Sequence, residues 1–296
     1  FIKSFDLLVA FRFLQGVGAA SLGSLNVTII GDLFEGRERG EAMGYNSAVI
    51  SVGTAFYPII GGLLASIGWY YPFLLPSFAF VIGGFVILRL DNPEPKNSQT
   101  IKEYFKNAFQ SIKNRNMIGL FILSILTFII LYGPYLTYFP FIIEDEFHEP
   151  PYIIGIIMSF ASLASFITST QVGNLLKSNS TKKLIIISTF FYFFSMASVP
   201  FINNVWLLII PSLLFGVAQG LNLPCVLSSL ATLAPMEQRA AVMSFNGMVL
   251  RLGQTLGPLI VVPVFAYGGL DAAYDMGAGL AVLMLIMATF VLKVSK

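Results

Sequence analysis

Charged residues are scarce in this sequence. Asp, Glu, Lys and Arg make up only 11% of its 296 residues, whereas a soluble domain typically carries about 25%. A water-facing surface of ordinary size cannot be built from so few charges. This excludes a soluble enzyme, a nucleic-acid-binding protein and a disordered regulator. The formal net charge of +2 is also too small for a polyanion-binding surface.

Residues that hold metals or form disulfides are almost absent. The one cysteine, Cys225, excludes a disulfide framework and a multi-cysteine metal site, and we expect it to be a small buried residue and not a nucleophile. The one histidine, His148, excludes a histidine-rich metal centre. The sequence has no GxxxxGK[ST] run that would suggest ATP use. We therefore expect no metal, no cofactor and no enzymatic activity.

Long apolar stretches dominate the sequence instead. Apolar residues make up 56% of the chain, and the mean hydropathy is +0.80. A bilayer core about 30 Å thick needs roughly 20 apolar residues per helix. The strict alternation typical of membrane barrels is absent, so the stretches predict an all-α membrane protein. We count nine of them, at 5–31, 41–67, 70–90, 117–143, 151–176, 183–202, 205–233, 240–267 and 270–293.

The beginning of the chain is unusual for a membrane protein. It opens with Phe1 and enters an apolar stretch within five residues. A signal peptide would need a basic segment, a short apolar core and a cleavage site, and none is found there. We interpret this beginning as a cut through a longer protein.

One clearly polar segment, residues 91–115, divides the chain. Pro93 and Pro95 end the helix that precedes it. Apolar residues then recur at helical spacing with lysines on the other side, which predicts an amphipathic helix on the membrane surface. The predicted domains are a truncated N-terminal bundle of three spans at 1–90, a linker at 91–115 and a six-helix bundle at 116–296.

The placement of lysine and arginine predicts the orientation in the membrane. Successive spans cross the membrane in opposite directions, so every second loop lies on the same side. If the linker is cytoplasmic, 14 of the 17 basic residues lie on the cytoplasmic side. The opposite loops are acidic, most clearly at 144–149. That cluster, with His148, is interpreted as a solvated outer loop, the alternative being a titrating gate. The chain is thus predicted to be a multi-pass protein of the plasma membrane, in contact with the lipid bilayer, with its linker and C-terminus in the cytoplasm.

Two parts of the chain match each other. The LQG at 14–16 pairs with the AQG at 218–220. Further on, Arg39 pairs with Arg239, Gly53 with Gly253 and Pro58 with Pro258, at a constant offset of 200. The first two predicted spans therefore correspond to the seventh and eighth. Parallel repeats of this kind are typical of transporters built from two related halves, so six helices are expected in the first half, of which three are present.

Three motifs carry a resemblance to a known family. Arg12, Gln15-Gly16 and Gly18-Ala19-Ala20 match RxxQGxGAA, and the segment 35–44 is similar to a cytoplasmic loop between two helices. The run from Gly44 to Gly62 fits G-x8-G-x3-GP-x2-GG, with Tyr57 in place of one glycine. The chain therefore resembles the major facilitator superfamily, beginning at the fourth of its twelve helices. The resemblance implies the major facilitator fold, with nine of twelve helices present, and the run 44–62 implies export.

A further loop, GNLLKSNSTKK at 173–183, resembles a decayed copy of the family's basic signature GxLaDrxGrk, with Lys177 where an acidic residue is expected. The glycines of these motifs allow helix backbones to approach closely and to rock against each other. The residues assigned to conformational motifs are Arg37, Arg39, Gly44, Gly53, Pro58, Gly61, Gly62, Gly173, Lys182, Lys183, Arg239, Gly253, Gly257 and Pro258.

Candidate binding residues are the polar side chains within the spans. Arg12, Gln15 and Asn26 share one face of the first span, which is interpreted as a cavity wall that contacts substrate or relays protons. Alternatively, Arg12 extends outward to the interface and the amides join neighbouring helices. Arg251, with Gln254 three residues on, lies near the middle of its span. It is interpreted as functional, or alternatively as bonded to backbone carbonyls.

Two more pairs complete the candidate set. Gln219 and Asn222 share a face of the seventh span, and the resemblance implies that this helix borders the central cavity, although amides also join packed helices. Tyr132 and Tyr135 lie beside Pro134, where a kink is expected. They offer stacking surfaces for an aromatic or cationic ligand, the alternative being an aromatic belt at the outer interface.

These observations predict a secondary transporter that exports a small drug-like or metabolite-like molecule by alternating access. Exchange for protons is implied by the resemblance alone. No Asp or Glu lies deep within a predicted span, so a proton-binding carboxylate is expected in helices outside this chain. Two alternatives stay open: an uptake symporter for a sugar, peptide or organic acid, and a non-transporting fragment.

Overall fold

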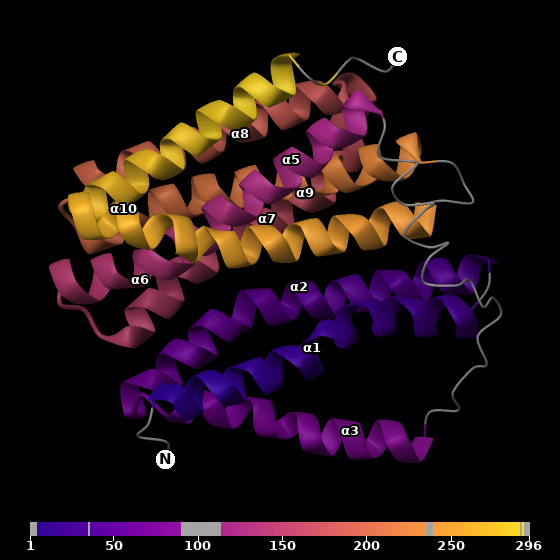
Figure 1. Cartoon of the computed structure of the whole chain (residues 1–296), viewed down its shortest axis with the longest axis horizontal. Coiled ribbons are helices and arrows are strands. Elements are labelled where there is room, and N and C mark those ends of the chain that lie inside the picture. Colours follow the sequence, from indigo (N-terminus) through magenta and orange to yellow (C-terminus); the bar gives the residue numbers. More distant parts are fainter. Residues whose placement is uncertain (1–4, 35, 90–113, 235–238, 291, 293–296) are drawn as a thin grey trace. The chain divides into compact units, whose positions relative to one another are not determined.

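The computed structural model describes residues 5–34, 36–89, 114–234, 239–290 and 292. Within these residues the chain is helical and has no strand (Figure 1). The first helices are α1 (Phe5–Leu33), α2 (Gly36–Ile67), the 3-10 helix η1 (Tyr71–Ser77) and α3 (Phe78–Arg89). Next come α5 (Arg115–Ile130), η2 (Leu131–Tyr138), α6 (Phe139–Phe141), η3 (Ile142–Glu146) and α7 (Pro151–Ser178). The last are α8 (Thr181–Ser198), η4 (Val199–Phe201), η5 (Val205–Leu208), α9 (Ile209–Leu233) and α10 (Arg239–Phe290).

The predicted spans coincide with these helices. Each of the nine apolar stretches falls on helical backbone in the described part of the chain, with ends that differ by a few residues. Six helical segments there are long and apolar enough to cross a membrane. The predicted all-α class is therefore confirmed.

A single glycine divides the last helical run. α10 is continuous over 52 residues, which at 1.5 Å per residue gives about 78 Å, far more than one bilayer crossing needs. Gly269 interrupts it with φ of 71° and ψ of −163°. An L side chain rarely adopts this backbone conformation, whereas glycine does so without steric cost. α10 is thus two membrane helices that meet at Gly269, as the separate stretches 240–267 and 270–293 predict.

The prolines of the fourth span change its helical geometry. The regular α-helix α5 ends at Ile130, and residues 131–138 form a π-helical segment that contains Pro134. Proline has no N–H to donate and crowds the preceding turn. The Thr137 hydroxyl donates to the Tyr132 carbonyl at 2.7 Å and so occupies one backbone acceptor within this irregular turn. The helix is therefore irregular at Pro134, and the predicted kink there stays a prediction.

Two segments predicted as loops are mostly helical. α2 begins at Gly36, so the predicted loop 35–44 is largely its first turns. α7 continues to Ser178 and α8 begins at Thr181, so the predicted loop 173–183 is reduced to two residues. Residues 35–44 contain three Glu and two Arg, and residues 173–183 contain two Leu and three Lys, all of which favour helix, and neither segment contains proline. The Ser180 side chain accepts a hydrogen bond from the Lys183 backbone at 3.3 Å and caps α8.

The chain forms two compact units. Unit 1 consists of residues 1–52 and 79–98, and unit 2 of residues 53–78 and 99–296. Unit 1 thus holds α1, the first half of α2 and most of α3, while unit 2 holds everything from α5 to α10. The predicted linker 91–115 lies outside the described residues except for its last two, and the predicted domain boundaries stay a prediction.

Unit 2 has a continuous apolar core in which helices approach closely. The core is lined by α5, α7, α8, α9 and α10, with side chains such as Leu123, Tyr192 and Met284 wholly buried. At Gly253 and Gly257, α10 lies directly against the backbone of α5 and η2. A methyl group on Gly257 would lie 2.8 Å from the Gly133 nitrogen, so only glycine fits there.

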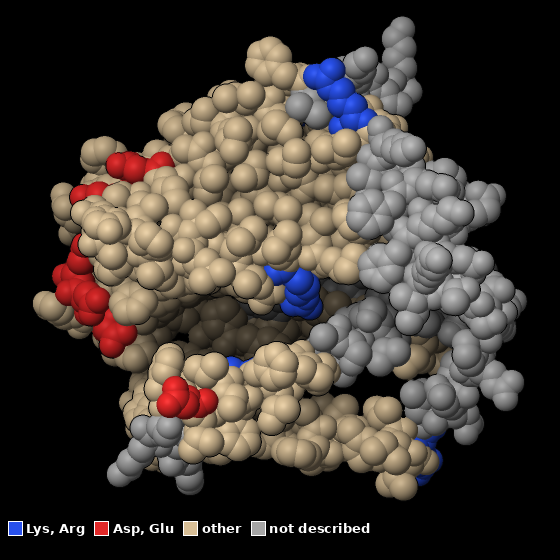
Figure 2. Space-filling view, in the orientation of Figure 1, with Lys and Arg blue, Asp and Glu red and all other residues tan. Residues whose placement is uncertain are grey.

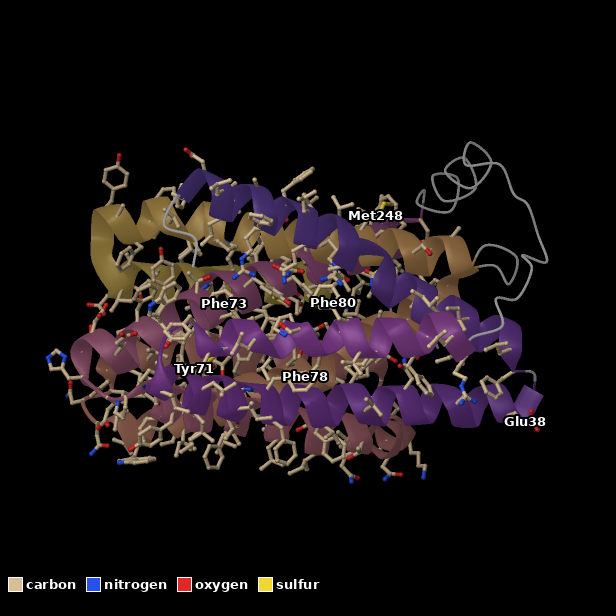
Figure 3. The ribbon with its side chains drawn as sticks, turned by 90° about the horizontal axis from the view of Figure 1, so that it is seen from below. Glu38, Tyr71, Phe73, Phe78, Phe80 and Met248 are labelled. Atoms are coloured by element: carbon tan, nitrogen blue, oxygen red, sulfur yellow. The ribbon has the colours of Figure 1, made fainter. Side chains whose placement is uncertain are left out.

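The segment formed by η1 and α3 is apolar and unburied. Phe78 and Phe80 are exposed by 67% and 86% of their surface, and Figure 3 labels both with Phe73 and Tyr71. The 19 residues from Tyr71 to Arg89 satisfy the requirements of a membrane span, yet none of their apolar window is buried in the structure. Lipid is the environment that suits such a helix.

Candidate functional site

On α1, the predicted neighbours Arg12 and Gln15 are joined. The Arg12 Nη1 donates a hydrogen bond to the Gln15 Oε1 at 2.9 Å, one turn along the helix. Both side chains are exposed in unit 1. The backbone of Asn26 lies on the same helix, but its side chain lies outside what the structure describes.

The same pair occurs on α10. The Arg251 Nη1 donates to the Gln254 Oε1 at 2.9 Å. Arg251 is exposed and Gln254 half-buried. Arg251 lies 12 residues after the start of α10, which corresponds to about 18 Å along the axis, close to the middle of a bilayer. A guanidinium therefore lies at mid-span on the outer surface of unit 2.

The face of α10 that carries Arg251 is the one turned away from α5. Gly253, Gly257 and Val261 point toward α5 and η2 and are buried. Met248, Arg251 and Thr255 occupy the opposite, exposed side, and Figure 3 labels Met248. An intramembrane arginine is costly in hydrocarbon and normally faces a cavity or a partner.

The two tyrosines of η2 differ in exposure. Tyr135 is only 3% exposed, and its ring is stacked on Phe215 of α9 with centroids 3.9 Å apart and planes 4° apart. Its hydroxyl donates to the Ser212 hydroxyl at 3.4 Å. Tyr132 is half-buried beside Phe128, with ring centroids 5.6 Å apart. Tyr132 is therefore accessible, while Tyr135 is held in the core of unit 2.

The amides of α9 hold helices together. The Tyr192 hydroxyl of α8 donates to the Gln219 Oε1. The Asn222 Nδ2 donates to the Thr127 hydroxyl of α5 at 3.0 Å, and Asn222 is 1% exposed. These contacts correspond to the alternative in which the amides join packed helices. Among the described residues, the buried Asn222 Oδ1 has no hydrogen-bond partner.

Several polar residues of this interior are not among the candidates that the sequence gives. The Ser124 hydroxyl donates to the Asn246 Oδ1 at 2.8 Å and so links α5 to α10. Tyr192 lies within a run of phenylalanines, where it could not be distinguished from core aromatics. The offset repeat does contain Asn246, paired with Asn46, and that pairing was the only available indication of a shared position.

The motif glycines fall into two groups. Methyl groups on Gly62, Gly253 and Gly257 would meet backbone atoms of neighbouring helices, at 2.6 Å from the Pro151 carbonyl oxygen in the case of Gly62. At Gly61 and Gly173 a methyl group would meet no heavy atom within 4 Å. A methyl group on Gly53 would lie 3.1 Å from the ring of Tyr57. Pro58 and Pro258 lie inside α2 and α10 without ending either helix. The side chains of Arg37, Arg39 and Arg239, and the surroundings of Gly44, lie outside what the structure describes.

Lys182, expected in a basic loop, instead caps a helix. It is the second residue of α8, and its Nζ donates to the carbonyls of Thr289 and Leu292 at 2.7 and 2.6 Å, at the end of α10. Arg115 of α5 donates to the Phe290 carbonyl at 3.0 Å. Cations favour helix C-termini because carbonyls there lack partners within the helix. Lys183, the next residue, is exposed.

Comparison with known proteins gives one family. The sequence model described as Major Facilitator Superfamily matches residues 1–258 and 139–296. A solved structure of similar fold is that of a bacterial homologue of the human lysosomal transporter Spinster, inward-facing and unoccupied. It has a TM-score of 0.64 and 15% sequence identity, and the match covers 98% of this chain and 77% of that one.

Curated relatives extend the likeness. The bacillibactin exporter of Bacillus subtilis is 24% identical over 272 residues, covering 88% of this chain and 66% of the relative. Multidrug resistance protein 2 of the same organism is 26% identical over 288 residues, covering 92% and 71%. Multidrug resistance protein MdtG of Salmonella arizonae is 24% identical over 247 residues, covering 81% and 61%. The chain thus spans about two thirds of the length of these relatives.

Proposed function

Because the chain belongs to the major facilitator superfamily, we propose that it exports a small drug-like or metabolite-like molecule across the plasma membrane in exchange for protons. The protein is a multi-pass membrane transporter with the all-α fold of that family. In this proposal the substrate is held near the bilayer midplane. The two halves rock about it and expose the substrate site alternately to each side of the membrane.

Export is supported by the relatives and by one motif. Three relatives that cover most of this chain are named for bacillibactin export or multidrug resistance. The run from Gly44 to Gly62 fits the glycine and proline pattern whose resemblance implies export. Bacillibactin and the drugs are named for those relatives and not for this protein. The substrate of this protein is proposed only as a small molecule of a similar kind.

Arg251 is the observation on which the proposed substrate path depends. Insertion scales give about 2.5–3.5 kcal/mol for an arginine at a helix centre, yet this one lies on the exposed face of α10 and not in the core of unit 2. A water-filled path along that face removes the cost. We assign Arg251, Gln254 and Tyr132 to the wall of this path in unit 2, and Arg12, Gln15 and Asn26 stay candidate substrate-binding residues on α1 of unit 1.

The buried candidates have a different role in this proposal. Tyr135, Gln219 and Asn222 each have a partner within unit 2. They stabilise the wall and would contact substrate only if the helices separated. Gly253 and Gly257 let α10 pack directly against α5. The face of α10 that carries Arg251 therefore moves together with the other helices of unit 2.

The charges of unit 2 support the proposed orientation. Described acidic residues lie at the end where η3 stops and where the second half of α10 begins, and Figure 2 shows acidic side chains gathered there. Lys177, Lys182 and Lys183 lie where α7 ends and α8 begins. By the positive-inside rule we place the lysine end, with the linker and the C-terminus, in the cytoplasm.

Transport by membrane vesicles tests this proposal. A fluorescent anion, fluorescein, or a fluorescent cation, ethidium, is added to the medium outside inverted vesicles that contain the whole protein. A proton gradient is then imposed across the vesicle membrane. Export predicts accumulation of at least one dye in inverted vesicles that ceases when the gradient is collapsed. Accumulation only in right-side-out vesicles would support the uptake symporter instead, and movement in neither would support a non-transporting fragment.

A further inference from the structure

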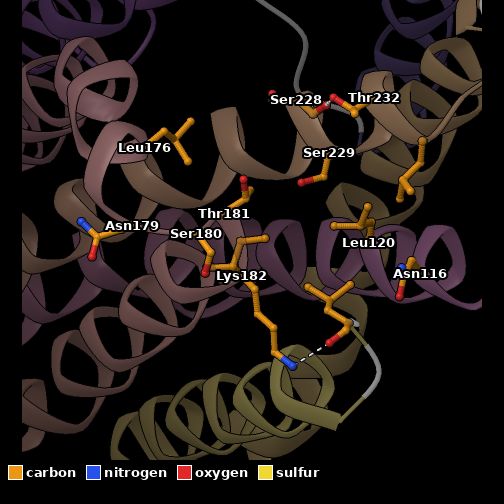
Figure 4. Close-up of a pocket in the computed structure, with 13 residues that line it drawn as sticks. Asn116, Leu120, Leu176, Asn179, Ser180, Thr181, Lys182, Ser228, Ser229 and Thr232 are labelled. Atoms are coloured by element: carbon orange, nitrogen blue, oxygen red, sulfur yellow. Dashed lines mark hydrogen bonds between the residues drawn. The ribbon is translucent and has the colours of Figure 1, made fainter. Parts of the chain in front are cut away.

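A pocket lies at the lysine end of unit 2. It has a volume of about 380 Å³ and is bordered by α5, α7, α8, α9 and the end of α10 (Figure 4). Its polar lining consists of Asn116, Asn179, Ser180, Thr181, Lys182, Ser228, Ser229 and Thr232. Leu120, Leu176, Ile185, Leu233 and Leu292 complete the wall.

The pocket is separate from the proposed substrate path. Thr181 and Lys182 are the first residues of α8, and Leu292 lies two residues after Phe290, the last residue of α10. The pocket therefore lies at the end of the bundle. Arg251 lies about 18 Å along α10 from its beginning. None of the residues assigned to the substrate path, Arg251, Gln254 and Tyr132, lines the pocket, so a ligand bound there would not contact them.

As far as the structure describes it, the lining combines one cation with many hydrogen-bonding groups and contains no carboxylate. Five hydroxyls, two amides and the ammonium of Lys182 face a space between apolar side chains. Two of the three protons of that ammonium are directed at the Thr289 and Leu292 carbonyls. These acceptors are neutral, so the positive charge of Lys182 is not compensated by a described carboxylate within the pocket.

The hydroxyls are available to a strong acceptor. Thr181 and Ser228 make no side-chain hydrogen bond within the described residues. Ser229 and Thr232 donate to carbonyls of their own helix, at 2.7 and 2.9 Å. Hydroxyl hydrogens rotate to suit their surroundings. Hydrogen bonds to an ionised acceptor are stronger than those between neutral groups, so an anionic oxygen entering the pocket would attract them.

The surrounding charge favours an anion as well. Lys183 and Arg115 lie on the same end of unit 2 as the pocket, on α8 and α5. Figure 4 shows the Lys182 side chain extending from α8 toward the end of α10, while Ser228, Ser229 and Thr232 lie on α9. A group with several acceptor oxygens matches the several hydrogen-bond donors that line the pocket on α8 and α9.

We propose that this pocket binds a phosphate group, carried either by the headgroup of an anionic phospholipid or by a free phosphate. A basic pocket between transmembrane helices on the cytoplasmic side is suited to lipid headgroups. The apolar residues of the wall would lie against the glycerol and the first methylenes of a lipid, whereas free phosphate would use the polar residues alone.

Binding to the purified protein in detergent tests the proposal. One arm titrates inorganic phosphate against chloride at equal ionic strength, and the other titrates dioleoylphosphatidylglycerol against dioleoylglycerol, which has the same chains without the phosphate. We expect saturable binding in at least one arm. Saturation by the lipid alone identifies the headgroup as the source, and saturation in both arms shows that the phosphate itself is sufficient.

Three variants connect that binding to the pocket. Lys182→Gln is expected to weaken the affinity by about tenfold or more, the effect of one charge-assisted hydrogen bond. Ser228→Leu fills the pocket without removing a hydrogen bond between helices and should abolish binding. Lys177→Gln is the matched control, because Lys177 bonds to Asn174 at 3.0 Å and does not line the pocket.

Two results would overturn the proposal. One is the absence of saturable binding in both arms. The other is an affinity that Lys182→Gln and Ser228→Leu leave as high as Lys177→Gln does. The affinity, and not the melting temperature, is the readout, because Lys182 also caps α10 and its replacement is expected to lower stability on that account.

Discussion

Arg251 donates a hydrogen bond to Gln254 at 2.9 Å, one turn along α10, on a face that points away from the core of unit 2. Arg12 and Gln15 repeat this arrangement on α1 at the same distance. The amide oxygen satisfies one of five guanidinium N–H donors and fixes the direction of the side chain. For Arg251, no other described residue accepts from the remaining donors, which are available to an acceptor from outside the helix.

Replacing Arg251 is expected to reduce transport without impairing insertion. Arg251→Ala should lower the initial rate of export at least tenfold, because a charge-assisted hydrogen bond contributes about 1.5–3 kcal/mol and each 1.4 kcal/mol is a factor of ten. The amount of protein in the membrane should not fall, since the side-chain bond of Arg251 lies within its own helix. Dye export normalised to protein level measures both.

Leu259→Ala is the control for that experiment. Leu259 is 64% exposed on the same helix and carries no polar group. Its replacement should leave export within about twofold of the original rate. Equal rates for Arg251→Ala and the unmodified protein would remove Arg251 from the substrate path.

Gly257 is expected to tolerate no side chain. In Gly257→Ala the new methyl group would lie 2.8 Å from the Gly133 nitrogen and 3.1 Å from the Ile129 carbonyl oxygen. Both are backbone atoms, so the helices must move apart, at a cost of about 1–3 kcal/mol. Thermal unfolding of the purified protein should show a lower midpoint.

Gly247→Ala is the matched variant on the same helix. A methyl group there meets no heavy atom within 4 Å. Alanine is favoured over glycine in a helix by about 0.5–1 kcal/mol, so the midpoint should stay the same or rise. If both variants lower the midpoint equally, close packing is not the role of Gly257.

The contact between Asn222 and Thr127 is expected to couple α9 to α5. A double-mutant cycle with Asn222→Leu and Thr127→Val should give an interaction free energy of about 0.5–1.5 kcal/mol, the range for a neutral hydrogen bond and for polar contacts in membrane proteins. Unfolding of the single and double variants in detergent measures it. Thr127→Val with Ser188→Ala is the comparison, because the Ser188 hydroxyl donates to the Ile185 carbonyl of its own helix and to no other described residue, and so should show no coupling.

The sequence predicts most of the fold because the bilayer imposes it. The positions of the long apolar stretches predict the helices to within a few residues of their observed ends. The break at Gly269 confirms that the last two stretches are separate helices. The loops were predicted less well. Residues 35–44 and 173–183 are polar, and hydropathy does not distinguish a polar loop from the polar end of a helix.

The candidate site was less predictable, for a physical reason. Helical spacing identified Arg12 with Gln15 and Arg251 with Gln254, because those partners lie on one helix. Whether Gln219 and Asn222 face a cavity or another helix depends on partners distant in the sequence, Tyr192 and Thr127. The cap formed by Lys182 on α10 likewise joins residues 107 and 110 positions apart.

Water accessibility along α10 tests the central claim most directly, namely that the face carrying Arg251 lines an aqueous path. The native Cys225 is buried and gives little background. Thr255→Cys places a thiol on the Arg251 face, and Leu283→Cys places one on the 43% exposed outer side of the second half of α10. A charged methanethiosulfonate should modify Thr255→Cys in membranes much faster than Leu283→Cys. Equally slow modification of both would contradict the account.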